Sequence, residues 1–169
     1  EIKLVDKQMI PDGNFTHAKS SNPEDKLALI DAIEIAKKNN SDLVIGTDPD
    51  ADRFGIVVKD FNDDFIQING NQSMIVLTDF LLSKLEYDKT KSFIASTVVS
   101  TPMMQKIADK NKVKLILSLT GFKWIGKMIN DFPSLNYICG GEESYGFLAG
   151  NFVRDKDALT SSLLISGLC

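Results

Sequence analysis

The stretch DLVIGTDPDADRFGIVVK, residues 42–59, sets an acidic loop between two short apolar runs. The runs, residues 42–47 and 55–59, have the length and pattern of buried strands. A third apolar run, residues 65–68, follows an Asn-Asp-Asp turn. Together the three runs predict a meander of strands, with the acidic loop between the first two.

Beyond the meander, short apolar runs alternate with segments of helical period, which is typical of α/β proteins with largely parallel sheets. One helix is expected to begin near Ser21 or Asn22, with Pro23 at its first position. Further strands are expected at residues 2–5, 93–99, 115–119 and 137–139. Further helices are expected at residues 72–85, 102–110 and 122–130, and from near Asp157.

The expected fold class is α/β, with two adjacent three-layer α/β/α domains whose sheets are mixed and largely parallel. The meander ends at an Asn-Gly-Asn turn, and we expect the domain boundary there. The first domain then covers residues 1–69 and the second covers residues 70–169.

Composition limits the partners and the cellular location. The 169 residues are 43% hydrophobic and 25% charged, with a net charge of -4. No basic run is longer than Lys37-Lys38, which argues against nucleic acid or a membrane surface as the main partner. No apolar stretch reaches the roughly 18 residues that span a bilayer. Two cysteines are too few for a disulfide framework, so we expect a cytoplasmic protein.

The ends of the sequence also carry information. The chain opens on EIKLV without an initiating methionine and closes inside an apolar run, LLISGLC. We therefore expect the 169 residues to be part of a longer enzyme.

The acidic loop is the first candidate site. Asp48, Asp50 and Asp52 stand at alternate positions directly after a predicted strand, where ligands bind in α/β sheets. Three close carboxylates repel one another unless a cation neutralises them, and oxygen ligands select Mg²⁺ or Ca²⁺ over zinc. An EF-hand is excluded, because Arg53 stands at the sixth position, where that motif needs glycine. A solvated acidic turn is the alternative.

A second candidate is GGEESYGF, residues 140–147, in which paired glycines allow a sharp turn after a predicted strand. Glu142 and Glu143 offer acceptors and Ser144 offers a hydroxyl, which together suit the hydroxyl groups of a sugar. A hydrolase elbow is excluded, because Gly141 lies three residues before the serine instead of two. A surface loop is the alternative.

A third candidate is GFKWIGK, residues 121–127, which has the spacing of a phosphate-binding P-loop. We reject a P-loop because Met128 follows instead of Ser or Thr, and because Phe122 and Trp124 are too bulky for a loop that wraps phosphate. The segment predicts a helix instead, with Lys123 near its start, where the lysine and the helix dipole can hold an anion. A solvated lysine is the alternative.

These segments resemble the motifs of the α-D-phosphohexomutase family, the phosphoglucomutases and phosphomannomutases. The resemblance extends over essentially all 169 residues, and the order and spacing of the motifs fit together. The similar segments are PDGNF at 11–15, SSNPED at 20–25, DPDADR at 48–53, TGFKWIG at 120–126, GGEESYGF at 140–147 and RDKDA at 154–158.

The resemblance implies a role for each site residue. Mg²⁺ would bind to Asp48, Asp50 and Asp52. Arg53 and Lys156 would be catalytic, and Lys156 is a candidate for acid/base work. The substrate-binding residues implied by the resemblance are Arg53, Lys123, Glu142 and Ser144. Without the family, residues 154–157 would be no more than a polar loop before a helix, with Asp157 as its cap.

The resemblance also implies what this chain lacks. Family members have four domains, with a phosphorylated serine in the first and a phosphate-binding loop in the fourth, and this chain covers most of the second and third. Ser21 lies in a Ser-Asn-Pro segment that is similar to the family's phosphoserine loop. Because this segment follows PDGNF, we expect Ser21 to be a helix-start residue and not the phosphoserine. We therefore expect the missing domains 1 and 4 of the same enzyme to be partners of this chain.

The reaction implied is reversible transfer between the 1- and 6-positions of a hexose phosphate, through glucose 1,6-bisphosphate or a similar intermediate. Glucose is the favoured sugar, and phosphomannomutase or phosphopentomutase specificity stays open. The isolated chain is predicted to be an inactive Mg²⁺- and sugar-phosphate-binding module. The rival enzyme class is a haloacid-dehalogenase-like phosphatase, whose Asp-x-Asp-x-Thr/Val motif fits the acidic loop in neither register.

Overall fold

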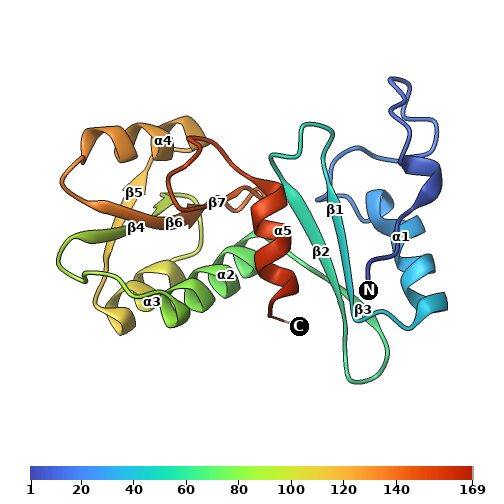
Figure 1. Cartoon of the computed structure of the whole chain (residues 1–169), viewed down its shortest axis with the longest axis horizontal. Helices are drawn as coiled ribbons and strands as arrows, with labels where there is room; N and C mark the ends of the chain where they lie inside the picture. The colour runs from blue at the N-terminus through green and yellow to red at the C-terminus, as the bar shows by residue number, and fades with distance from the viewer. Residues whose placement is uncertain (169) are drawn as a thin grey trace.

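The computed structural model describes residues 1–168, which form two sheets with helices packed around them (Figure 1). The first sheet has the strand order β1-β2-β3, and the second has the order β5-β4-β6-β7. The strands are β1 (Leu43–Thr47), β2 (Phe54–Lys59), β3 (Phe65–Ile68), β4 (Ser92–Thr97), β5 (Lys114–Ser118), β6 (Asn136–Gly141) and β7 (Phe147–Ala149). The helices are the 3-10 turn η1 (Asp6–Gln8), α1 (Lys26–Asn39), α2 (Gly70–Lys84), α3 (Met103–Asn111), α4 (Phe122–Asp131) and α5 (Ala158–Ser166).

The second sheet lies between two layers of helices. Its strands β5, β4 and β6 are parallel, and β7 returns antiparallel to β6. Successive residues of β4 face opposite sides, so Ile94 packs into the core with α2 and α3 while Phe93 packs with α4. The expectation of a mixed, largely parallel sheet between helices is confirmed for this half of the chain.

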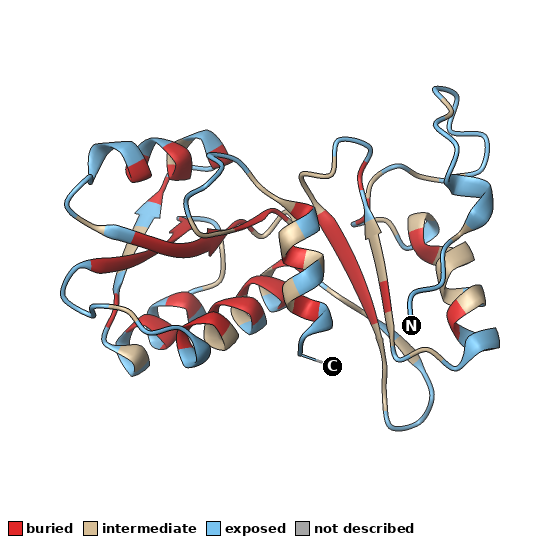
Figure 2. Ribbon diagram, in the orientation of Figure 1, coloured by how far each residue is buried: buried red, intermediate tan, exposed pale blue. Residues whose placement is uncertain are grey.

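The first sheet differs from that expectation, because all of its strand pairs are antiparallel. The loop between β1 and β2 covers only residues 48–53, which can close an antiparallel pair but is too short for a parallel crossover. One face of the sheet packs against α1 through Val44 and Val57. The other face joins the core of α2 and α5 through Phe54 and Ile56, so the buried residues of β2 continue into the second half (Figure 2).

The predicted strand at residues 2–5 is wrong. This segment has no strand partner within the described chain, and Ile2 is 85% exposed. An extended segment needs a neighbouring strand for its backbone hydrogen bonds. Here the chain turns into η1 instead, and Val5 O accepts a hydrogen bond from Gln8 N–H at 2.8 Å.

The expected start of the first helix is also wrong, because α1 begins after Asp25. The Asp25 carboxylate caps the helix by accepting from Leu27 N–H at 2.9 Å. Pro23 is buried against the first sheet, where its carbonyl oxygen accepts from Gln67 Nε2 at 3.2 Å. That contact holds Pro23 on the sheet, so neither Ser21 nor the residue after it caps the helix.

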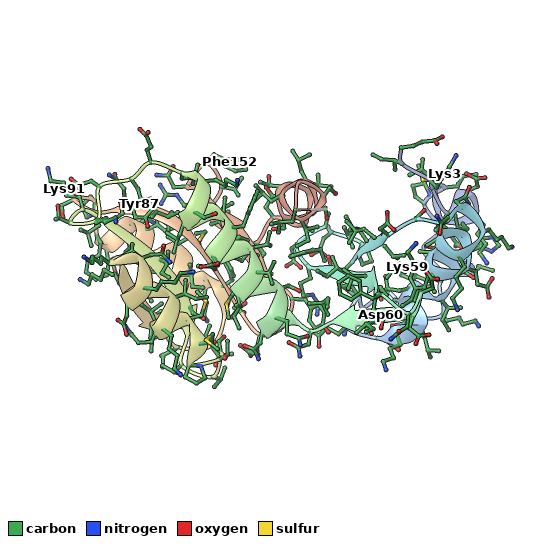
Figure 3. The ribbon with its side chains drawn as sticks, turned by 90° about the horizontal axis from the view of Figure 1, so that it is seen from below. Lys3, Lys59, Asp60, Tyr87, Lys91 and Phe152 are labelled. Atoms are coloured by element: carbon green, nitrogen blue, oxygen red, sulfur yellow. The ribbon has the colours of Figure 1, made fainter. Side chains whose placement is uncertain are left out.

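The remaining predicted elements are present with small changes in their ends, and β7 is an addition. It has only three residues, which is too short for the sequence pattern to predict a strand or its pairing with β6 across the 142–146 loop. Figure 3 shows α5 nearly end-on between the two halves, with Lys3, Lys59 and Asp60 on one side and Tyr87 and Lys91 on the other. Among residues 1–168, no helix has the length and apolar character needed to cross a membrane.

Cys139 lies in the middle of β6 and is 0% exposed. Burial raises the pKa of its thiol from 9.0 to about 12. The raised pKa of this thiol therefore contributes to the free energy of unfolding. The contribution is fully present below pH 9.0 and is lost as the pH rises towards about 12. We expect the thiol to resist alkylation by iodoacetamide at pH 8 in the folded chain and to react after unfolding in urea.

This prediction is best measured in a Cys169→Ser background, so that mass spectrometry reports one thiol. A Cys139→Ala variant of the same chain should lose stability less steeply between pH 9 and 11 than its parent. Rapid alkylation of the folded parent at pH 8 would contradict the buried, neutral thiol.

Candidate active site at the junction of the two sheets

Four loops carry or directly precede the predicted site residues, and the N-terminal end of α5 lies between the two sheets near them (Figure 1). They are the acidic loop between β1 and β2 (residues 48–53), the turn before α4 (119–121), the β6–β7 loop (142–146) and the loop before α5 (150–157). All four lie at strand ends or helix starts, which is where α/β sheets present ligand-binding groups.

Backbone hydrogen bonds join the acidic loop and the residue after it to the β6–β7 loop and to the start of α5. Phe54 N–H donates to Tyr145 O in the β6–β7 loop at 3.2 Å, and Ala158 N–H at the start of α5 donates to Ala51 O at 3.0 Å. Ala51 has a φ of 55°, a left-handed conformation that turns the acidic loop back on itself. The relative placement of these three segments is therefore set by the main chain and does not depend on side chains alone.

The acidic loop brings three carboxylates together. Asp48, Asp50 and Asp52 each offer an oxygen, and these three oxygens lie within 4.8 Å of one another. Asp48 is 4% exposed, while Asp50 is exposed at the surface of the loop. Hard oxygen donors at this spacing fit a hard divalent cation such as Mg²⁺ or Ca²⁺. The donor set therefore suits the metal that the sequence predicts.

Two basic side chains neutralise the buried part of the acidic loop. Asp48 Oδ2 accepts from Arg53 Nε at 2.8 Å, and its Oδ1 accepts from the backbone N–H groups of Asp52 and Arg53, both at 3.0 Å. Lys156 Nζ pairs with Asp52 Oδ2 at 2.8 Å. Arg53 Nη1 reaches Glu24 Oε1 at 3.5 Å as well. Two cations from separate segments thus meet one carboxylate cluster.

The electrostatics of the cluster follow from these contacts. Burial raises the pKa of Asp48, but the hydrogen bonds from Arg53 outweigh it and hold that pKa below its ordinary value. Asp52 has its pKa raised, because burial and the neighbouring Asp48 outweigh the pairing with Lys156. Burial lowers the pKa of Lys156, yet its pairs with Asp52 and Asp155 raise it overall. These contacts favour the protonated form of Lys156, and its role in acid/base work stays a prediction.

Glu142 connects the β6–β7 loop to the turn before α4. Its Oε1 accepts from Gly121 N–H at 2.8 Å, and the residue is 6% exposed. Burial raises the pKa of this carboxyl, although the Gly121 hydrogen bond opposes that shift. Ser144, two residues along, is partly exposed, and its hydroxyl makes no hydrogen bond within residues 1–168. The loop thus presents one anchored carboxylate and one hydroxyl free to bind a ligand.

Lys123 is less closely tied to the cluster than the other predicted residues. It lies in the first turn of α4 and is exposed, with its Nζ 5.5 Å from the centroid of the Trp124 ring. The ring of Phe122, its other neighbour, lies 5.5 Å from Lys156 Nζ. The start of α4 is thus at the site, while the Lys123 amino group contacts none of the other predicted residues in the described chain.

Several polar groups that hold the predicted residues were not predicted from the sequence. Glu24 contacts Arg53, and Asp155 pairs with Lys156 Nζ at 3.0 Å. Thr97 and Ser100 bind the carboxylate of Glu143. The last two lie at and just after the end of the parallel strand β4, and that position could have indicated a contribution to the site.

Comparisons with known proteins cover both halves of the chain. Residues 69–169 match the family model of phosphoglucomutase/phosphomannomutase alpha/beta/alpha domain III, and residues 1–62 match that of domain II. Phosphoglucomutases from Staphylococcus aureus strain N315 and Staphylococcus epidermidis strain ATCC 12228 are each 42% identical over 160 residues. The match covers 94% of this chain and 29% of each relative, so the chain spans less than a third of their length.

Solved structures share the fold at low sequence identity. A putative phosphomannomutase from Thermus thermophilus has a TM-score of 0.71 and 20% identity, over 86% of this chain and 31% of that one. A phosphoglucomutase/phosphomannomutase family protein from Burkholderia thailandensis has a TM-score of 0.70 and 20% identity, over 90% of this chain and 31% of that one. N-acetylphosphoglucosamine mutase from Aspergillus fumigatus was solved with GlcNAc-6P and magnesium. It has a TM-score of 0.56 and 14% identity, over 73% of this chain and 32% of that one.

Proposed function

Because this chain belongs to the phosphoglucomutase/phosphomannomutase family, we propose that it is the central, metal- and sugar-binding part of a phosphohexomutase. The complete enzyme would interconvert hexose 1-phosphate and hexose 6-phosphate through a phosphoserine and a 1,6-bisphosphate. The phosphoserine lies outside this chain in the proposal. The 42% identity to staphylococcal phosphoglucomutases favours glucose as the sugar.

The pairing of Lys156 with Asp52 is the observation that carries this proposal. The 2.8 Å ion pair joins the loop before α5 to the acidic loop, two segments more than a hundred positions apart in sequence. It gathers cations and carboxylates beside the β6–β7 loop, whose Glu142 and Ser144 suit a sugar. Phosphoryl transfer depends mainly on such positioning and charge neutralisation.

The acidic loop is the proposed metal site. Asp48, Asp50 and Asp52 would hold Mg²⁺, and the solved A. fumigatus mutase, which contains magnesium, supports this choice of ion. When bound, the ion would supply positive charge to an oxygen of the transferring phosphoryl group.

The other charges come from the chain itself. Asp48 Oδ2 accepts from Arg53 Nε at 2.8 Å and Glu24 Oε1 lies 3.5 Å from Nη1, so Nη2 is the guanidinium nitrogen left to hold a phosphate oxygen. Lys156 stays protonated and would stabilise phosphate charge at the site. Lys123 would hold the phosphate at the other end of the substrate, with support from the free N–H groups at the start of α4. Glu142 would bind the sugar together with the Ser144 hydroxyl.

A reaction through a phosphorylated aspartate is disfavoured by the same geometry. In such an enzyme Asp48, directly after the strand, would be the nucleophile. Its carboxylate is 4% exposed, and both oxygens already accept hydrogen bonds from Arg53 or from the loop backbone. Attack would break this hydrogen-bond network, so a mutase is the better assignment.

The proposed domains are residues 1–69 and residues 70–169, and the two family matches support a division near that point. Residues 1–169 alone are expected to convert no glucose 1-phosphate, since the proposed phosphoserine is supplied by another part of the enzyme. The full-length enzyme is expected to convert it to glucose 6-phosphate. Assays on glucose, mannose and glucosamine 1-phosphates would then define the sugar preference.

Asp50→Asn tests the metal site with little risk to folding, because Asp50 is exposed. We expect it to weaken Mg²⁺ binding by about tenfold or more, since one of three carboxylate donors is lost. Calorimetric titration with MgCl₂ measures this directly, and the mutase assay should show a matching increase in the Mg²⁺ requirement. Asp64→Asn, at another exposed aspartate, is the control. Equal Mg²⁺ affinity in both variants would contradict the proposed site.

A further inference from the structure

Two hydroxyl groups at the end of β4 hold the side chain of Glu143. Glu143 Oε2 accepts from Thr97 Oγ1 at 3.1 Å and from Ser100 Oγ at 2.8 Å. The two hydroxyl oxygens are themselves 2.7 Å apart, so their two hydrogens supply two of these three contacts at a time, and Thr97 is 1% exposed. We call Thr97 and Ser100 the hydroxyl clamp. Hydrogen bonds to an ionised carboxylate are stronger than neutral ones, so the clamp is a firm attachment point for the β6–β7 loop.

The loop is anchored on its other side as well. Glu142 accepts from Gly121 N–H at 2.8 Å, so neighbouring glutamates attach the loop to two different segments. The main chain at Glu143 packs closely on Gly70, where an added Cβ would lie 2.7 Å from the Glu143 carbonyl carbon. Ser144 follows directly, with its hydroxyl free in the described chain. The conformation that presents Glu142 and Ser144 is therefore held from both sides.

We propose that Glu143 is a positioning residue, which acts through the hydroxyl clamp to fix the loop that carries Glu142 and Ser144. It would set the affinity for the sugar without touching the substrate. This inference rests on the proposed function, because Glu142 and Ser144 are the sugar-binding pair in that proposal. A loop held in its binding conformation before the ligand arrives avoids the cost of ordering it on binding.

The kinetic test uses the full-length enzyme. We expect Glu143→Ala to raise KM for glucose 1-phosphate by about tenfold, with a smaller effect on kcat. Ser100→Ala should raise KM less, and the double variant should be no worse than Glu143→Ala, because both changes remove one interaction. Glu143→Gln keeps an oxygen that can accept from both hydroxyls and should recover most of the affinity. Glu86→Ala, at an exposed glutamate, is the matched control.

A different pattern would overturn the proposal. If Ser100→Ala leaves KM unchanged, or if the two effects multiply, Glu143 binds the sugar itself and the clamp has no part in affinity. A loss of kcat alone, with KM unchanged, would likewise contradict a role in holding the sugar loop.

A second measurement does not depend on activity. Hydrogen exchange reports two amides that bond to the loop, Glu142 N–H to Gly146 O and Phe54 N–H to Tyr145 O. Glu143→Ala should speed exchange at both, because the loop opens more often. Unchanged exchange would refute the anchoring role even if KM rises. If the wild-type enzyme lacked mutase activity, the proposed function would fail, while exchange would still decide whether Glu143 holds the loop.

Discussion

Lys156→Met is expected to lower kcat of the full-length enzyme by about 100-fold or more, the usual effect of removing a charge that stabilises a phosphoryl-transfer transition state. Lys156 Nζ pairs with Asp52 at 2.8 Å, and those contacts keep its pKa above the ordinary value, so the variant removes a full positive charge. Methionine is the suitable replacement because the lysine stem packs on Gly146, and an unbranched side chain keeps that contact.

The control for this variant is Lys127→Met. Lys127 is exposed on α4 and pairs with Asp131, four residues along the same helix. Surface pairs of this kind contribute little to stability, and this one contacts none of the predicted site residues in the described chain. We expect kcat within about twofold of wild type, as surface changes are usually near neutral. Similar kcat values for the two lysine variants would rule out a catalytic role for Lys156.

Gly70→Ala is expected to destabilise the chain by about 3 kcal/mol, near the upper end of the usual cost of overpacking. Gly70 is the first residue of α2 and is buried against the main chain of the β6–β7 loop. An added Cβ would lie 2.7 Å from both the Glu143 carbonyl carbon and the Tyr145 nitrogen. These are backbone atoms, so no side chain can rotate away, and either the helix or the loop must shift.

The stability change can be measured by urea unfolding of residues 1–169, followed by the fluorescence of Trp124, the single tryptophan. Gly13→Ala is the matched control, because an added Cβ there meets nothing within 4 Å. The same Gly70→Ala change should raise KM in the full-length enzyme, since the shifted loop carries Glu142 and Ser144. A Gly70→Ala variant as stable as Gly13→Ala would show that the helix and loop are not closely packed.

Much of the second half of the fold could be predicted from the sequence. Strands β4 and β6 are largely buried and the helices are separated by clear turns, so length and composition identify both. The parallel arrangement follows because a helix connects each of these strands to the next. The short strand β7 escaped prediction because its three residues form a strand only by pairing with β6.

The first half was harder to predict for physical reasons. Residues 2–5 have the apolar pattern of a strand, but pattern alone does not supply a partner, and within the described chain they pair with none. Pro23 suits the first turn of a helix, yet its carbonyl is held on the first sheet by Gln67. In the first case the missing partner decides the structure, and in the second a contact distant in sequence overrides a local preference.

In the candidate site, too, local sequence predicts some features and distant contacts decide the others. The alternating aspartates and their position after a strand predict a metal site, and their oxygens do lie together. The pairing of Lys156 with Asp52 and the capping of Gly121 by Glu142 could not be derived from spacing, because each joins segments that only the fold brings together. The resemblance to a family indicated that these segments share a site, but it did not indicate which atoms meet.

The backbone bonds around the acidic loop have a mechanical consequence. The loop is joined to the β6–β7 loop through Phe54 and to α5 through Ala158, so the carboxylates and the sugar loop share one frame. In the proposed mutase, we expect these two sheets to move as a single body. The proposed bisphosphate intermediate would then reorient while the carboxylates of the acidic loop and the sugar-binding side chains keep their relative positions. Any hinge between domains would lie outside the two sheets.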